Sequence, residues 1–335
     1  MEVFSMNMSI GKLRHGERNL ISDVPEVRVG HATVDRDDCH TGVTVVLPPP
    51  RNPFAEKLTA ASCVFNGYGK TLGLVQVDEL GSLETPIALT NTLNVGKVHD
   101  ALVSYMVGLC REDGIRLTSV NPVVCECNDS RISDIAQRPI GEEEVFAAIR
   151  NASADFAQGA VGAGRGTLCY GMKGGIGSSS RVMEIDGKTF TMGVLVQSNY
   201  GASEDFRMAT LPPELSESDQ GSIILILATD LPLSARQLRR VLRRTSVGMA
   251  RLGSYIGHGS GEIAVGCTTA RLQACGESFL TQAILREDLM NLPFRAAGEC
   301  AEEAILQSMW NADPDMMLNG TKVPSLREFL KEKSL

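Results

Sequence analysis

Short apolar runs with turn residues between them dominate the first part of the chain. Residues 27–34, 43–47, 60–65 and 86–90 are rich in Val, Ala and Thr, with Gly, Pro, Asn or Asp between the runs. Runs of this kind predict β-strands. Apolar residues then recur at helical spacing from Val95 to Leu109, directly after Asn94, a residue type that favours the N-cap position. This spacing predicts an amphipathic helix.

The middle of the chain contains a hairpin signal followed by a polar segment. We expect a strand at 117–124, which runs into the polar residues 125–130, and a short helix at 142–149. Asp186-Gly187 separates the β-rich runs 182–185 and 189–196, and this dipeptide is typical of a tight hairpin turn. Residues 199–221 are polar and acidic and include two prolines, which indicates an exposed, mobile loop.

A continuous apolar run begins abruptly at Ser222, directly after that loop. Its sequence, Ser-Ile-Ile-Leu-Ile-Leu-Ala-Thr-Asp, is typical of a strand buried on both faces. Helices at about 234–252 and 286–310 and a strand at 262–269 follow it. This order fits neither strict strand–helix alternation nor an all-helical protein. We therefore expect an α+β fold in one domain, 1–335, with sheets packed on each other and helices outside.

Composition and charge exclude several classes of partner. The chain of 335 residues carries a formal net charge of −8, whereas proteins that grip nucleic acid need clustered Lys and Arg. The arginine-rich segment 236–244 has helical spacing and is interpreted as a solvated helix face. No apolar stretch has membrane-spanning length, and residues 1–20 lack the apolar core of a signal peptide. We expect no nucleic-acid partner, no membrane partner and a cytoplasmic location.

Residue types that bind metals or nucleotides are present, but not at the required spacing. Nine scattered Cys suit a reducing compartment, and Cys125-x-Cys127 has no second Cys or His pair at zinc-site spacing around it. The glycine-rich segments 159–166 and 173–178 match neither a dinucleotide fingerprint nor a P-loop, so turns explain them better. The sequence predicts chemistry that needs no metal and no cofactor.

The Gly221-Ser222 pair has the residue types that an autocatalytic cleavage needs. Gly tolerates a strained, positive-φ backbone that brings the following hydroxyl onto its carbonyl, which favours an N-to-O acyl shift. Cleavage would leave Ser222 with a free α-amine, whose pKa of about 7.7–8.0 allows it to act as the general base for its own hydroxyl. Gly-Ser pairs are common in loops, so this hypothesis depends on the acidic loop before the pair and on partners downstream.

Several short motifs make the chain resemble the P1-type peptidases, a family that includes L-aminopeptidase/D-amidase-esterases and β-peptidyl aminopeptidases. The resemblance extends from about residue 27 to about residue 304 and rests on the motifs jointly. They are Val29-Gly30-His31, Asn66-Gly67-Tyr68-Gly69, Glu79-Leu80-Gly81, Thr90-Asn91-Thr92 with Val95-Gly96, Lys173-Gly174-Gly175-Ile176-Gly177, Gln197-Ser198-Asn199-Tyr200-Gly201, Ala228-Thr229-Asp230 and Gly259-Ser260-Gly261-Glu262.

The resemblance implies a four-layer αββα sandwich of the N-terminal-nucleophile type, with Ser222 as the nucleophile. Self-processing after Gly221 would then divide the domain into an α chain, 1–221, and a β chain, 222–335. Ser260 and Glu262 lie 38 and 40 residues after Ser222, at the family's spacing for a second serine and a glutamate that tune the nucleophile. The alternative is that both residues simply begin a strand after a glycine turn.

Three further residues receive roles through the resemblance, Asn199 in catalysis and Glu126 and Asn128 in substrate binding. Asn199 would donate its side-chain amide to the oxyanion, the alternative being a left-handed turn residue at a strand end. Glu126 would bind the ammonium group of the substrate, the alternative being an undirected surface glutamate. Asn128 stands where some relatives have a Tyr in Glu-x-Tyr-Asp, so the second oxyanion donor and the shape of the pocket differ here.

The implied activity is a self-processing serine aminopeptidase or amidase that acts on a small peptide or aminoacyl amide through an acyl-enzyme. The preferred N-terminal residue could be an L-, D- or β-amino acid. The implied assembly is a homotetramer or a larger oligomer of processed α and β chains. Two alternatives remain: an acyltransferase of the ornithine acetyltransferase type, which uses a processed Thr, and a non-catalytic homologue that keeps the fold as a binding module.

Overall fold

Two β-sheets lie face to face at the centre of the protein. The computed structural model describes residues 10–207 and 220–333. One sheet has the strand order β1-β2-β5-β6 and the other has the order β4-β3-β12-β11-β10-β9. The first sheet consists of β1 (Arg28–Arg36), β2 (Cys39–Leu47), β5 (Ile87–Asn91) and β6 (Val123–Cys127). The second consists of β4 (Ser82–Leu83), β3 (Leu58–Gly67), β12 (Gly259–Thr268), β11 (Gln220–Thr229), β10 (Lys188–Asn199) and β9 (Gly175–Ile185).

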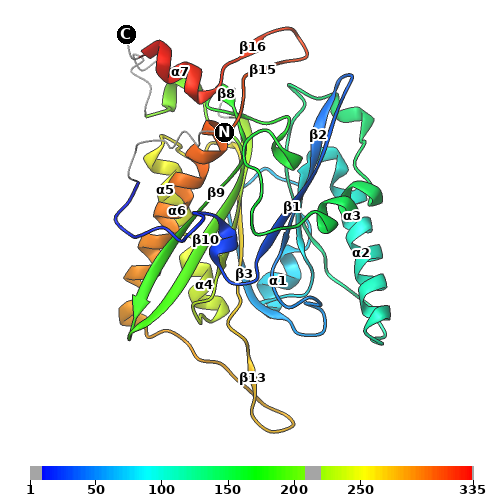
Figure 1. Cartoon of the computed structure of the whole chain (residues 1–335), viewed down its shortest axis with the longest axis vertical. Helices are drawn as coiled ribbons and strands as arrows, with labels where there is room; N and C mark the ends of the chain where they lie inside the picture. The colour runs from blue at the N-terminus through cyan, green and yellow to red at the C-terminus, as the bar shows by residue number, and fades with distance from the viewer. Residues whose placement is uncertain (1–9, 208–219, 334–335) are drawn as a thin grey trace.

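Helices cover the outer face of each sheet, so that the layers run helix, sheet, sheet, helix (Figure 1). The first sheet packs on α2 (Val95–Glu112) and α3 (Glu142–Arg150). The second packs on α4 (Ala235–Leu242), α5 (Thr245–Arg251) and α6 (Asn291–Trp310). The remaining elements are α1 (Leu74–Leu80), α7 (Leu326–Lys333) and the two-stranded pairs β7 (Leu168–Cys169) with β8 (Met172–Lys173), β13 (Gln273–Ala274) with β14 (Leu280–Thr281), and β15 (Asp315–Met316) with β16 (Lys322–Val323).

Strand alternation divides the apolar side chains of β11 between two cores. Ile224 and Ile226 join the core between the sheets, whereas Ile223, Leu225 and Leu227 join the core under α4, α5 and α6. A strand with apolar residues on both faces belongs between two layers, which explains the continuous apolar run after Ser222. The predicted α+β sandwich of four layers is confirmed.

Two predicted elements have the expected form. The hairpin of β9 and β10 turns at Asp186 and Gly187, whose φ angles of 51° and 72° suit the tight turn that Asp-Gly favours. The amphipathic helix is α2, but the Asn94 side chain makes no capping bond. The carbonyl oxygen of the Asn91 side chain instead accepts a hydrogen bond from the Asn94 N–H at 3.1 Å, one turn earlier.

Several predicted boundaries differ from the observed ones, and at two of them a hydrogen bond accounts for the difference. The strand expected at 117–124 is β6, Val123–Cys127, since the Asn121 N–H bonds to Glu84 at 2.8 Å instead of joining a ladder. The helix expected at 234–252 divides into α4 and α5, where the hydroxyl of Thr245 donates to the Leu242 carbonyl at 2.7 Å. The strand expected to begin at Ser222 begins two residues earlier, at Gln220.

The acidic loop expected at 199–221 is described only at its ends. Asn199 closes β10 and Gln220 opens β11, while residues 208–219 lie outside the described part of the chain. Within residues 10–207 and 220–333, no helix combines the length and the apolar character needed to span a bilayer.

Candidate active site

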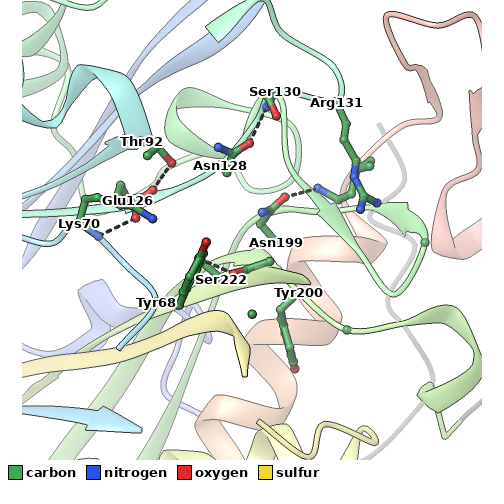
Figure 2. A pocket seen from close by; sticks show the side chains of 15 residues that line it. Tyr68, Lys70, Thr92, Glu126, Asn128, Ser130, Arg131, Asn199, Tyr200 and Ser222 are labelled. Atoms are coloured by element: carbon green, nitrogen blue, oxygen red, sulfur yellow. Dashed lines mark hydrogen bonds between the residues drawn. The ribbon is translucent and has the colours of Figure 1, made fainter. Parts of the chain in front are cut away.

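A cavity of about 380 Å³ opens where the ends of β10 and β11 meet the segments that follow β3 and β6 (Figure 2). Its wall contains five of the residues singled out in the sequence, namely Gly221, Ser222, Asn199, Glu126 and Asn128. These residues come from three separate parts of the chain, and the two sheets bring them together.

Ser222 is held by strand pairing on both sides. Its Cα partners are Asn199 on the antiparallel strand β10 and Gly261 on the parallel strand β12. The hydroxyl donates a hydrogen bond of 2.6 Å to the Gly221 carbonyl oxygen, and the residue is only 4% exposed. A Cβ at Gly261 would lie 3.1 Å from the Ser222 Oγ, so the glycine leaves room for the hydroxyl.

Gly221 is required for a different reason from the one expected. Its φ does not lie in the left-handed region, so the expected positive φ is wrong. A Cβ at this position would instead lie 2.1 Å from the Asn199 carbonyl oxygen and 2.8 Å from the Tyr200 Cα. Because both contacts are with backbone, any larger residue would force the two strands apart next to Ser222.

Asn199 presents a fixed side-chain amide to the cavity. Its Oδ1 accepts a hydrogen bond of 2.9 Å from the Leu168 N–H, which orients the amide and leaves the Nδ2 donor for the cavity (Figure 2). Asn199 belongs to β10 and is not among the residues with positive φ, so the alternative of a left-handed turn residue is wrong.

A buried lysine supports the segment that orients this amide, and no sequence signal had given it a role. Lys173 is 0% exposed, and its ammonium donates to the carbonyls of Gly164, Thr167 and Gly174 at 3.3, 3.0 and 3.2 Å. The lysine therefore anchors the segment that carries the Leu168 N–H. Burial lowers the pKa of Lys173 from 10.5 to about 7.

This pKa predicts a pH-dependent stability. Between about pH 7 and pH 10 the unfolded chain binds a proton at Lys173 and the folded chain does not, so the free energy of unfolding should rise with pH. The difference in unfolding free energy between the wild type and Lys173→Met should rise by up to about 1.4 kcal/mol per pH unit in that window and be flat below it. Urea titrations across this range measure it. The exposed Lys188→Met is the control, and a flat difference for Lys173→Met would contradict the shift.

Glu126 places a buried carboxylate in the opposite part of the cavity wall. Its Oε1 accepts the Lys70 N–H at 2.9 Å and its Oε2 accepts the Thr92 hydroxyl. At 2% exposure it is not an undirected surface residue. Two donors hold the group, and its remaining lone pairs allow it to accept hydrogen bonds from a cationic ligand.

Asn128 lies exposed at the rim of the same cavity, two residues after Glu126. Its Oδ1 accepts the Ser130 N–H at 3.0 Å, which leaves its Nδ2 as a donor. Asn128 therefore places an amide donor at the rim of the cavity.

Ser260 and Glu262 do not line the cavity. Both lie on β12 and are 0% exposed. The parallel register pairs Ser260 with Gly221 and Glu262 with Ile223, so they flank Gly261, the partner of Ser222. Since neighbouring strand residues point to opposite faces, their side chains extend away from the face of Gly261. Their backbone lies next to the Gly221–Ser222 peptide, because β12 pairs with β11 at these residues.

Four cationic or aromatic residues of the cavity wall had received no role from the sequence: Tyr68, Lys70, Arg131 and Tyr200. The Lys70 ammonium lies over the Tyr68 ring, 4.6 Å from its centroid. Tyr68 belongs to the motif Asn66-Gly67-Tyr68-Gly69, which was a signal for this segment, whereas nothing in the sequence singled out Arg131.

Comparisons with known proteins agree with this geometry. The model of peptidase family S58 matches residues 19–323. The β-peptidyl aminopeptidase BapA of Sphingosinicella xenopeptidilytica is 34% identical over 341 residues, which cover 92% of this chain and 84% of that protein.

Solved structures extend the likeness to the whole architecture. A β-aminopeptidase of Burkholderia sp. has a TM-score of 0.86 at 34% identity, covering 97% of this chain and 96% of that one. The L-aminopeptidase D-Ala-esterase/amidase of Ochrobactrum anthropi, described as a variant of the Ntn hydrolase fold, has a TM-score of 0.85 at 30% identity, with 96% of each chain covered. These matches do not favour the acyltransferase alternative. The chain belongs to peptidase family S58 and is an N-terminal-nucleophile hydrolase of the aminopeptidase class.

Proposed function

We propose that the chain cleaves its own Gly221–Ser222 bond and then hydrolyses the amide bond after the N-terminal residue of a small peptide or aminoacyl amide. The observation that carries the proposal is the position of the Ser222 hydroxyl, 2.6 Å from the Gly221 carbonyl oxygen in the cavity wall. Strand pairing places Asn199 directly opposite Ser222, so that their side chains lie on the same face of the sheet.

Self-processing would begin with attack of the Ser222 Oγ on the Gly221 carbonyl carbon. The C–N bond breaks as the α-nitrogen of Ser222 takes up the proton, and water then hydrolyses the resulting ester to a Gly221 carboxylate and the free serine. Residues 223–229 keep their pairing with β10 and β12, which holds the new terminus in the cavity. The register with Ser260 supports a role for that serine and Glu262 in tuning the new amine.

Substrate hydrolysis would reuse the same groups. The Ser222 amine accepts the hydroxyl proton, and Oγ attacks the substrate carbonyl carbon while the Asn199 Nδ2 donates to the oxyanion. The amine returns the proton to the leaving nitrogen, and water resolves the acyl-enzyme. Glu126 accepts hydrogen bonds from the substrate ammonium, and Asn128 borders the side chain of the N-terminal residue.

The names of the relatives support more than one type of N-terminal substrate residue. One relative is named for β-peptides, and another is named for D-alanyl esters and amides; L-aminoacyl peptides would fit the same ammonium site. We further propose a cytoplasmic homotetramer or larger oligomer of paired α and β chains. The nine thiols, all free, support a reducing compartment.

Two measurements on the purified protein test the proposal. Intact mass and N-terminal sequencing should find chains 1–221 and 222–335, with Ser222 at the start of the smaller one. Nitroanilides of L-, D- and β-amino acids should release the chromophore without added metal. Finding only uncleaved chain in active preparations, or ornithine-dependent acetyl transfer in place of hydrolysis, would overturn it.

A further inference from the structure

Arg131 introduces a cationic group on the side of the cavity opposite Glu126. Both residues line the same cavity as Ser222. In Figure 2, Glu126 and Arg131 lie on opposite sides of Asn199, with Ser222 below it. The wall therefore presents a carboxylate, then the nucleophile with its amide donor, then a guanidinium.

The backbone that carries Arg131 is anchored at several points. The segment leaves β6 in a turn, in which the N–H groups of Ile132 and Ser133 donate to the Asp129 carbonyl at 3.0 and 2.9 Å. The Arg131 carbonyl itself accepts the Leu318 N–H at 3.0 Å. Because both sides of the residue are held, its side chain extends from a fixed position.

Arg131 is exposed in the cavity wall, so an external anion can reach its guanidinium. Across residues 10–207 and 220–333, its guanidinium has no ion pair, whereas Arg165 and Arg181 each bind two carboxylates. The chain has a formal net charge of −8, so the lack of an ion pair at Arg131 among the described residues is not explained by a shortage of carboxylates. The other cation of the wall, Lys70, already lies over the Tyr68 ring.

We infer that Arg131 binds the free α-carboxylate of the leaving amino acid, so that the preferred substrates are dipeptides with an unblocked C-terminus. The inference rests on the proposed function, because it assigns the leaving group to the Arg131 side of Ser222. The planar guanidinium donates two parallel N–H bonds to a carboxylate, which an amide or an ester terminus cannot accept in the same way.

The size of the cavity supports a short substrate. An extended dipeptide spans roughly 7 Å, because each residue adds at most about 3.6 Å. A cavity of about 380 Å³ lies at the small end of the range of ligand pockets. With the ammonium at Glu126 and the scissile carbonyl at Ser222, a second residue places its carboxylate on the side of Arg131.

The test compares a dipeptide with the C-terminal amide of the same dipeptide, using the complete processed protein. The wild type should favour the free acid, and Arg131→Met should lower kcat/KM for it by roughly 10- to 100-fold, mainly through KM. Turnover of the amide should stay within about twofold. Arg131→Lys should retain part of the preference, since a point charge remains without the fork. Arg116→Met removes an exposed arginine outside the cavity wall and should change neither substrate.

The outcomes separate this inference from the proposed function. An unchanged ratio of acid to amide turnover in Arg131→Met, or an equal loss for both substrates, would overturn the carboxylate site while the aminopeptidase activity stands. Failure of the wild type to hydrolyse either substrate would overturn both proposals together.

Discussion

Ser222→Ala is expected to remain a single uncleaved chain and to lose at least about 10⁴-fold in kcat/KM, since one residue supplies both the nucleophile and the new terminus. The loss of one hydroxyl at a strand residue should leave the fold intact, because pairing with β10 and β12 uses only backbone groups. Denaturing gels, intact mass and nitroanilide release measure the two effects.

A second variant provides the matched comparison for Ser222. Ser222→Cys keeps a nucleophile of similar size and should retain measurable self-processing, although at a lower rate. Cleavage after Gly221 in the alanine variant would show that another group attacks this bond and would contradict the mechanism.

Asn199→Ala is expected to lower kcat by about 10²- to 10³-fold with little change in KM, because an oxyanion donor acts mainly in the transition state. The same change also removes the acceptor of the Leu168 N–H, which is bound at 2.9 Å. Asn199→Asp keeps an acceptor for that N–H and removes the Nδ2 donor. Steady-state kinetics on both variants, with thermal melts, therefore divide the catalytic effect from the structural one.

A loss of kcat in both variants supports the oxyanion role of Asn199. Full activity in Asn199→Asp would contradict it and would assign the residue to the support of the β7 segment. Asn128→Ala, at the exposed rim of the same cavity, should have a smaller effect than either variant.

Elements with a strong local pattern could be predicted from the sequence. The Asp186-Gly187 turn and the helix from Val95 carry their own signals, and the apolar run after Ser222 indicated a strand between two layers. The break between α4 and α5 could not be predicted, because the apolar spacing continues across it. The hydroxyl of Thr245 bonds the carbonyl three residues earlier, and that contact has no signature in the spacing.

The cavity was predictable only where motifs marked it. Asn199 belongs to a motif that carried the family resemblance, and Ser222 and Glu126 received their roles through that resemblance. Arg131, in contrast, follows β6 in an unmarked turn. The steric need for Gly221 depends on the Asn199 carbonyl, which strand pairing brings within 2.1 Å of its Cβ position. A contact between two strands that are distant in sequence cannot be read from either strand alone.

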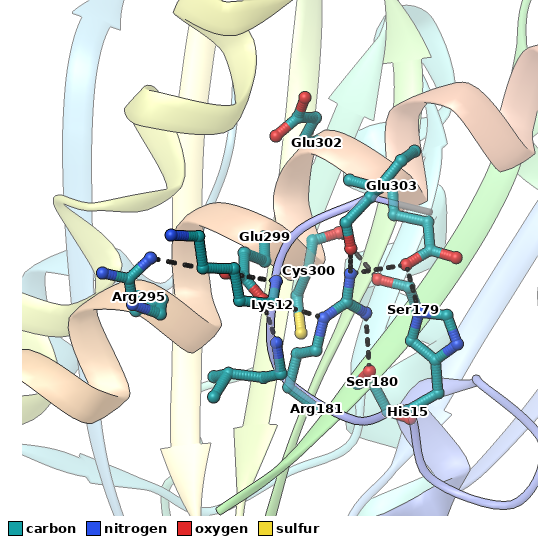
Figure 3. A network of polar contacts seen from close by, with 12 residues as sticks. Lys12, His15, Ser179, Ser180, Arg181, Arg295, Glu299, Cys300, Glu302 and Glu303 are labelled. Carbon is teal, nitrogen blue, oxygen red and sulfur yellow. Dashed lines mark hydrogen bonds and ion pairs between the residues drawn. The ribbon is translucent and has the colours of Figure 1, made fainter. Parts of the chain in front are cut away.

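The contacts of Arg181, which is fully buried beneath α6 (Figure 3), could not be predicted from the sequence either. Its guanidinium pairs with Glu299 at 3.2 Å and Glu303 at 2.7 Å, and it donates to the Ile10 carbonyl at 2.7 Å. These partners come from α6 and from the start of the described chain. A single arginine among serines on a strand gives no sign that it ties three distant segments together.

The strand order of the larger sheet has a consequence for the proposed mature enzyme. β4, β3, β10 and β9 precede Ser222 in the chain, whereas β12 and all but the first two residues of β11 lie from Ser222 onwards. β12 and β11 pair between β3 and β10, so both sets share one sheet. Once the bond is cut, global unfolding releases two molecules instead of one. The midpoint temperature of unfolding of the cleaved protein should then rise with protein concentration, as it does for a heterodimer. The midpoint temperature of an uncleaved monomeric precursor should not depend on concentration.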